Sequence, residues 1–147
     1  MAKAVISKIM IVGSTPTVRA NLGMIMILLL TLLLIKHFIW DFWYQPPYMW
    51  QNKGTFGHIG GIVHSGIHAV TTYFILTFWL AEPLGAMLLA GFEFVVHYIT
   101  DWAKMNINRL KGWTATTHNE FWQLTGFDQL VHQLTYVAIL ATIYGVN

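Results

Sequence analysis

The sequence of 147 residues contains no cysteine, and only 10% of its residues are charged. The absence of cysteine excludes disulfide bonds, thiolate metal ligands and a cysteine nucleophile. Soluble domains average about 25% charged residues, so this chain has less than half of the usual solvating charge. Its net charge of +2 is too small to indicate nucleic acid as a partner. These shortages disfavour a soluble cytosolic enzyme, a secreted disulfide-rich protein and a disordered chain.

The chain is instead rich in apolar residues, at 56% hydrophobic and 15% aromatic. Apolar segments cover residues 22–44, 59–80, 84–103 and 127–144, and about 20 helical residues suffice to cross the hydrocarbon core of a bilayer. Pro46-Pro47 ends the first segment, and Glu82-Pro83 separates the second from the third. Short connections make neighbouring helices antiparallel. The sequence therefore predicts an all-α polytopic membrane protein, an antiparallel four-helix transmembrane bundle.

The predicted organisation is an N-terminal extension over residues 1–20 and a single membrane domain over 21–147. Within that domain, the polar segment 105–125 contains Trp113 and Trp122, and tryptophan is typical of a membrane interface. We therefore expect an interfacial loop at 105–125, on the same side as the loop 45–58. That side has four cations (Lys53, Lys104, Arg109, Lys111) against three on the other (Lys3, Lys8, Arg19). The positive-inside rule then weakly favours cytoplasmic loops.

Polar residues inside the four segments recur at intervals of four. The first segment has His37, Asp41 and Gln45, the second His64 and His68, the third Glu93, His97 and Asp101, and the fourth Asp128 and His132. A spacing of four places side chains on one face of a helix, one turn apart. In an antiparallel bundle, all four polar ladders come to the same end. Ionisable groups in a membrane usually face the bundle interior and mark function.

The residue types favour a metal centre. Histidine nitrogen and carboxylate oxygen without sulfur suit Zn, Mn, Fe or a similar divalent ion, and helical bundles build dinuclear sites from such ladders. The candidate ligands are His37, Asp41, His64, His68, His97, Asp101, Asp128 and His132. They suffice for two ions, or for one ion whose ligands are oriented by the remaining groups. The alternative is a hydrogen-bonded network without metal that fixes helix register.

At these residues the chain resembles a family of small bacterial and phage integral membrane proteins of unknown function. The resemblance covers roughly residues 30–140 and rests on an HxxxDFxxQ motif at His37–Gln45, an HxxxDxxK motif at His97–Lys104, and DQxxHxLT at Asp128–Thr135. It implies the fold and the residue set, but no reaction. The bacterial proteins in this family make a bacterial inner membrane the expected location. A looser likeness to membrane-bound metal-dependent hydrolases is an analogy of fold alone.

The leading functional interpretation is a metal-dependent hydrolase acting on a lipid or phosphate ester at the membrane face. Glu93 or Asp101 is the candidate general base, and Gln45, Lys53, Lys104 and Arg109 are candidate substrate contacts. Two alternatives remain. One is a protein that handles ions or protons, and the other is an accessory subunit or phage membrane factor, in a homo-oligomer or larger complex, whose polar cluster is structural.

Overall fold

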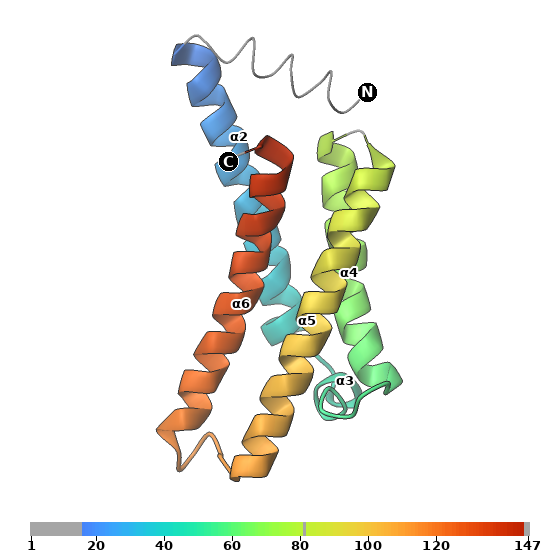
Figure 1. The fold of residues 1–147 in the computed structure, drawn as a ribbon, viewed down its shortest axis with the longest axis vertical. Helices are drawn as coiled ribbons and strands as arrows, with labels where there is room; N and C mark the ends of the chain where they lie inside the picture. The colour runs from blue at the N-terminus through green and yellow to red at the C-terminus, as the bar shows by residue number, and fades with distance from the viewer. Residues whose placement is uncertain (1–15, 81, 146–147) are drawn as a thin grey trace.

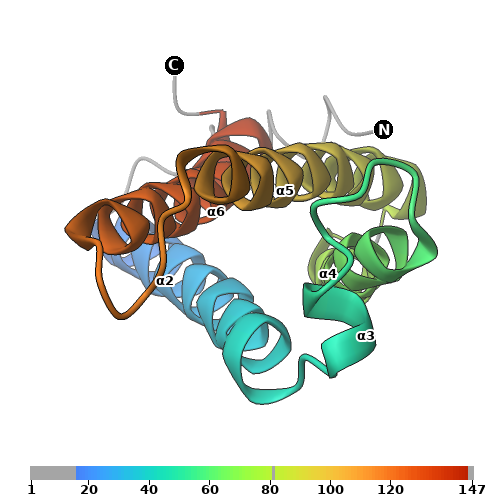
Figure 2. The same ribbon diagram turned by 90° about the horizontal axis from the view of Figure 1, so that it is seen from below.

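The computed structural model describes residues 16–80 and 82–145, and every regular element in these ranges is helical. Four long helices dominate: α2 (Pro16–Phe38), α4 (Ile59–Leu80), α5 (Pro83–Lys111) and α6 (Asn119–Tyr144). A π-helical turn, η1 (Ile39–Trp43), continues α2, and the short helix α3 (Pro47–Trp50) follows it. In Figure 1, α2 and α5 run downwards, whereas α4 and α6 run upwards. Each of the four long helices packs mainly against two of the others, in the order α2, α4, α5, α6 and back to α2 (Figure 2).

Proline and glycine mark the helix boundaries. Pro16, Pro47 and Pro83 each occupy the first position of a helix, where the missing N–H and the fixed φ of proline are favourable. The side chain of Glu82 accepts a hydrogen bond from the backbone N–H of Leu84 at 3.2 Å and caps α5. Gly112 ends α5 with φ of 68°, a left-handed conformation that glycine adopts without steric cost.

The helices differ in length from the predicted segments. Helix α2 begins at Pro16, so the predicted extension over 1–20 overlaps it, and residues 1–15 lie outside the described residues. The predicted interfacial segment 105–125 is partly helical, because α5 continues to Lys111 and α6 already begins at Asn119. Only residues 112–118 connect them. The polarity of residues 105–111 did not exclude a helix, because the stretch contains neither glycine nor proline and the other residues differ in helix propensity by less than about 1 kcal/mol each.

Three helical segments are long and apolar enough to cross a membrane: Ala20–Trp43, Ile59–Leu80 and Pro83–Lys111. Helix α6 is not among them, since Asp128, Gln129, His132 and Gln133 make its first half polar. The outer surface is apolar, as Phe78 is 88% exposed and Leu88 65% exposed. Exposed aromatic and aliphatic side chains around a polar interior are typical of a protein surrounded by lipid. The protein is therefore a helical protein associated with a membrane.

The interior has two layers. Near the end of the molecule at which α4 ends and α5 begins, Leu29, Leu33, Leu76, Ala86 and Ile139 form an apolar core with their neighbours. The other layer is polar: it includes residues from all four long helices and η1, and most of its side chains are less than 5% exposed. The apolar layer holds the helices together, and the polar layer contains the candidate site.

Candidate metal centre

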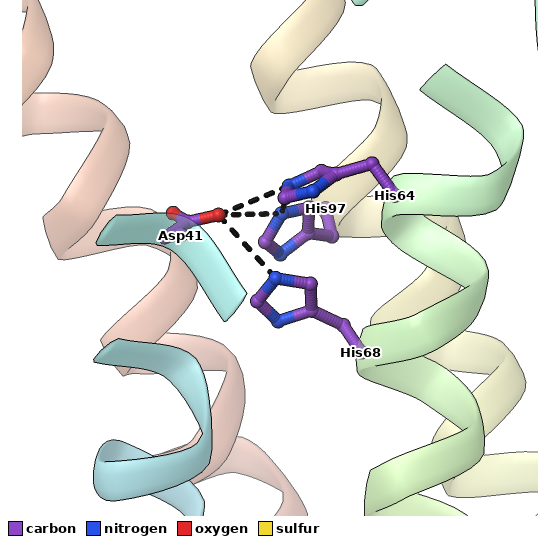
Figure 3. A group of neighbouring side chains, drawn as sticks. All are labelled: Asp41, His64, His68 and His97. Carbon is purple, nitrogen blue, oxygen red and sulfur yellow. Dashed lines mark hydrogen bonds and ion pairs between the residues drawn. The ribbon is translucent and has the colours of Figure 1, made fainter. Parts of the chain in front are cut away.

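Four of the predicted metal ligands meet at a single point. Asp41 on η1, His64 and His68 on α4, and His97 on α5 point toward one another, as Figure 3 shows. One ligand atom from each of them lies within 4.8 Å of every other. The three histidines are no more than 1% exposed. The four-residue spacing on α4 therefore produces the predicted convergence.

The distances within this group, the Asp41 group, match those of a metal coordination shell. Asp41 Oδ1 lies 3.0 Å from His64 Nε2, 3.3 Å from His68 Nε2 and 3.5 Å from His97 Nε2. The His64 and His97 Nε2 atoms are 3.0 Å apart. Four ligands at metal distances of about 2.0–2.1 Å in a tetrahedron lie about 3.3–3.4 Å from one another. The observed separations bracket that value.

Two of these ligand atoms have unused hydrogen-bonding capacity. Among the described residues, Asp41 Oδ1 and His68 Nε2 are buried and have no hydrogen-bond partner of acceptable geometry. A buried polar atom without a partner costs roughly 1–3 kcal/mol. Folding rarely leaves several such atoms directed at one point unless something else satisfies them. A divalent cation does so, because each atom can donate a lone pair to it.

A second group of candidate ligands adjoins the first. His97, Asp101 and His132 also offer ligand atoms within 4.8 Å of one another. Asp101 Oδ2 lies 3.2 Å from His64 Nε2 and 3.3 Å from His97 Nε2, whereas Asp101 Oδ1 lies 3.9 Å from His132 Nε2. The rings of His97 and His132 stack, with centroids 3.9 Å apart. One carboxylate therefore faces both groups.

His37 and Asp128, also predicted as ligands, lie beside these groups and belong to neither. His37 Nε2 is 3.3 Å from Asp41 Oδ2 and 2.9 Å from the side-chain oxygen of Gln129. The amide nitrogen of Gln129 donates hydrogen bonds to Asp41 Oδ2 and Asp128 Oδ2, both at 3.1 Å. Asp128 Oδ1 is 3.5 Å from His132 Nε2. These contacts fix the orientation of the ligating side chains, as outer hydrogen bonds do in metal sites.

The predicted substrate contacts have different surroundings. Lys53 and Lys104 bond to the cluster carboxylates: Lys53 Nζ is 2.7 Å from Asp101 Oδ2, and Lys104 Nζ is 2.7 Å from Asp128 Oδ2. The side-chain nitrogen of Gln45 lies 3.3 Å from His64 Nδ1. Arg109 bonds to Asn106 on an exposed part of α5. Three of the four predicted contacts thus adjoin the metal ligands, and Arg109 lies two helical turns beyond Asp101.

Glu93, a candidate general base, lies deeper than the metal ligands. It forms an ion pair with Lys36 and accepts a hydrogen bond from the Tyr136 hydroxyl at 2.8 Å. Lys36 also donates to the backbone carbonyl of His68 at 3.1 Å. Sequence reasoning missed Lys36, Tyr136 and Gln129. A signal for Lys36 existed, because a lysine within one predicted span and a glutamate within another are expected to pair.

Comparison with known proteins identifies the family. The family model described as "Protein of unknown function (DUF3307)" matches residues 29–147, which include the whole polar cluster. The chain belongs to this family. No curated protein and no solved structure matches it.

The part of the chain that matches the DUF3307 model contains all the candidate ligands, from Asp41 on η1 to His132 on α6. The description of the family states no activity, so the chemistry of this DUF3307 member has to be argued from its own side chains.

Proposed function

We propose that the chain is an integral membrane protein that binds a divalent transition-metal ion through Asp41, His64, His68 and His97. One observation supports this most strongly: four buried ligand atoms, from three separate helical elements, lie at mutual distances suited to one ion. Zn, Mn and Fe all accept imidazole and carboxylate ligands. Zinc is the favoured candidate, because the ligand separations of 3.0–3.5 Å include the value of about 3.3–3.4 Å expected for its tetrahedral sites.

We further propose that all four long helices cross the membrane as an antiparallel bundle. Two of the polar residues that lower the hydropathy of α6 support this, because Asp128 and His132 are 1% and 2% exposed. They face other helices and not lipid, so they add little to the cost of inserting the assembled bundle. We propose a bacterial inner membrane with residues 45–58 and 112–118 on the cytoplasmic side, in accordance with the charge distribution of the sequence.

The proposed activity is metal-dependent hydrolysis of a phosphate ester carried by an amphiphile. A metal ion lowers the pKa of its bound water and stabilises the charge that develops on a substrate oxygen. The water oxygen attacks phosphorus, and Asp101 takes up a water proton. The bond from phosphorus to the ester oxygen breaks, and that oxygen receives the proton, so the products are an alcohol and a phosphate.

The charges around the cluster support an anionic substrate. The ammonium groups of Lys53 and Lys104 both contact Asp101, at 2.7 Å and 3.3 Å. An incoming phosphate group can take over these ammonium contacts while it approaches the ion. Asp101 is the better candidate base, because Glu93 is already bonded to Lys36 and Tyr136. We propose that Glu93 helps to position His68, whose Nδ1 is 3.9 Å from Glu93 Oε1.

One observation favours a second candidate function, in which the bound ion is structural and the protein catalyses no reaction. The Asp41 group supplies four protein ligands, and its histidines are 0–1% exposed. Structural zinc sites have four protein ligands, whereas catalytic sites leave one position for water. In this case the ion stabilises the bundle, or the protein acts as an accessory subunit of a larger membrane complex.

A hydrolysis assay separates the two functions. Metal-loaded protein in detergent is incubated with a panel of phospholipids and lipid-linked phosphates, and phosphate or alcohol release is measured. The catalytic proposal predicts turnover that falls at least about 100-fold in Asp101→Asn, the loss expected for a general base. The matched control Glu120→Gln alters an exposed carboxylate at the start of α6 and should retain turnover. Metal-loaded wild type without turnover on the panel supports the structural function instead.

A further inference from the structure

The side of the cluster formed by α6 contains ligand atoms that the Asp41 group does not use. His132 Nε2 lies 3.5 Å from Asp128 Oδ1 and 3.9 Å from Asp101 Oδ1. Within residues 16–80 and 82–145, His132 Nε2 and Asp128 Oδ1 have no hydrogen-bond partner of acceptable geometry. All three residues are 1–2% exposed. Buried, unpaired atoms of this kind require a partner.

We propose that Asp101, Asp128 and His132 hold a second divalent ion beside the first. This inference rests on the proposed metal centre and deepens it. His97 belongs to both candidate groups, but one nitrogen lone pair binds one ion, and His97 Nε2 lies 3.0 Å from His64 Nε2, within the Asp41 group. Asp128 then takes its place in the second group. Asp101 lies between the two groups: Oδ1 faces His132 and also accepts a hydrogen bond from Lys104 Nζ at 3.3 Å, whereas Oδ2 faces His64 and His97. Its Oδ1 would bind the second ion, and Oδ2 remains the oxygen proposed to act as the base.

The hydrogen bonds of Asp128 leave one of its oxygens available for metal. Lys104 Nζ and the Gln129 amide both donate to Oδ2, at 2.7 Å and 3.1 Å. Oδ1 remains directed at His132. Asp128 does more than neutralise Lys104, because its other oxygen is buried 3.5 Å from His132 Nε2 without a hydrogen bond of acceptable geometry to any described residue. The two donors hold the carboxylate in one orientation, as outer-shell hydrogen bonds do for metal ligands.

A second ion also bears on the class of substrate. Three protein ligands leave coordination positions open for water or substrate oxygen, which the Asp41 group with its four ligands lacks. Paired ions about 3.5–4 Å apart stabilise the attacking and leaving oxygens of a phosphate ester together. Lys104, at 15% side-chain exposure, is more accessible than the carboxylates it contacts, so an anionic group would approach past it. The paired centre therefore favours a phosphate ester over a carboxylate ester.

The test is the number of ions bound by each folded chain. Protein without a polyhistidine tag is equilibrated with Mn²⁺, freed of excess metal, and analysed for metal content and by electron paramagnetic resonance. We expect two ions per chain in the wild type, and the spectrum of a magnetically coupled Mn²⁺ pair. His132→Ala and the conservative Asp128→Asn should each retain one ion and lose the coupling. Gln133→Ala, at an exposed position next to His132 on α6, should retain both ions.

The outcomes distinguish failure of this inference from failure of the metal centre itself. If the wild-type chain binds one ion, and this ion is lost in His68→Ala but kept in His132→Ala, the first site is supported and the second is contradicted. Loss of all metal in both His132→Ala and Asp128→Asn also overturns it, because these residues then belong to a single shared site. A folded wild-type chain that binds no ion contradicts the proposed function as well. Circular dichroism and gel filtration in detergent establish that each variant is folded.

Discussion

Lys36 of α2 and Glu93 of α5 form an ion pair in the interior of the protein, where the two residues are 4% and 1% exposed. The pair joins three helices, because Lys36 also bonds to the His68 carbonyl on α4. Tyr136 extends it to α6 through its hydrogen bond with Glu93. The pair thus lies directly between the apolar core and the metal ligands.

The first prediction concerns the stability of this pair. Lys36→Met leaves a buried carboxylate without its cation, and breaking a buried pair in this way costs about 3–5 kcal/mol. The double variant Lys36→Met/Glu93→Met removes both charges and should recover most of that loss. Thermal unfolding in detergent measures both variants. If the double variant is as unstable as Lys36→Met, the unpaired charge of Glu93 is not the cause of the lost stability.

The second prediction concerns Gln129. Its amide donates to Asp41 and Asp128 and its oxygen bonds to His37, so it orients side chains on both sides of the cluster. Gln129→Leu preserves the volume but removes these bonds, and we expect metal affinity to fall by about 10–100-fold. A competition titration against a zinc chelator gives the affinity. The matched control is Gln133→Leu, on the exposed side of α6. Equal affinities in both variants would contradict the orienting role.

The third prediction concerns removal of the metal. An ion that binds only the folded state, when present at 100 times its dissociation constant, stabilises that state by about 2.7 kcal/mol. Treatment with a chelator should therefore lower the melting temperature of the wild type, and added Zn²⁺ should restore it. His68→Ala should show a smaller shift, because only the proposed second site at Asp101, Asp128 and His132 remains in that variant. An identical shift in His68→Ala would place the ion elsewhere in the protein.

The fourth prediction concerns whether α6 crosses the membrane. Because the chain has no cysteine, single cysteines can be placed freely. Thr116→Cys, before α6, and a cysteine added after Asn147 should react with a membrane-impermeant maleimide from opposite sides. Intact and permeabilised bacterial cells report which side is labelled. Labelling of both positions from the same side would contradict a bundle of four spanning helices.

The sequence predicted the polar layer because helical periodicity is a local property. Residues four apart lie on the same face of a helix whatever surrounds it, so the sequence alone indicates that His64 and His68 point in the same direction. The same reasoning identified Asp41, His97, Asp101 and His132, which the structure brings together. Their convergence followed from the alternating direction of the helices.

Contacts between helices were harder to predict, since they depend on helix rotation and depth. The pairing of Lys36 with Glu93 and the bonds of Gln129 join residues far apart in the sequence. The division of the ligands into two groups, with His37 outside both, depends on side-chain positions of the same kind. The π-helical turn that contains Asp41 adds one residue to a helical turn, and no simple residue pattern indicates it.

The central claim is that Asp41, His64, His68 and His97 bind one metal ion, and X-ray absorption at the zinc edge tests it most directly. The sample is tag-free protein in detergent, loaded with one equivalent of Zn²⁺ so that the first site dominates. The account predicts a shell of nitrogen and oxygen ligands at about 2.0–2.2 Å, with the outer-shell scattering of about three imidazoles, which decreases in His68→Ala. Failure of the folded protein to take up zinc, or a bound zinc without imidazole scattering, would contradict it.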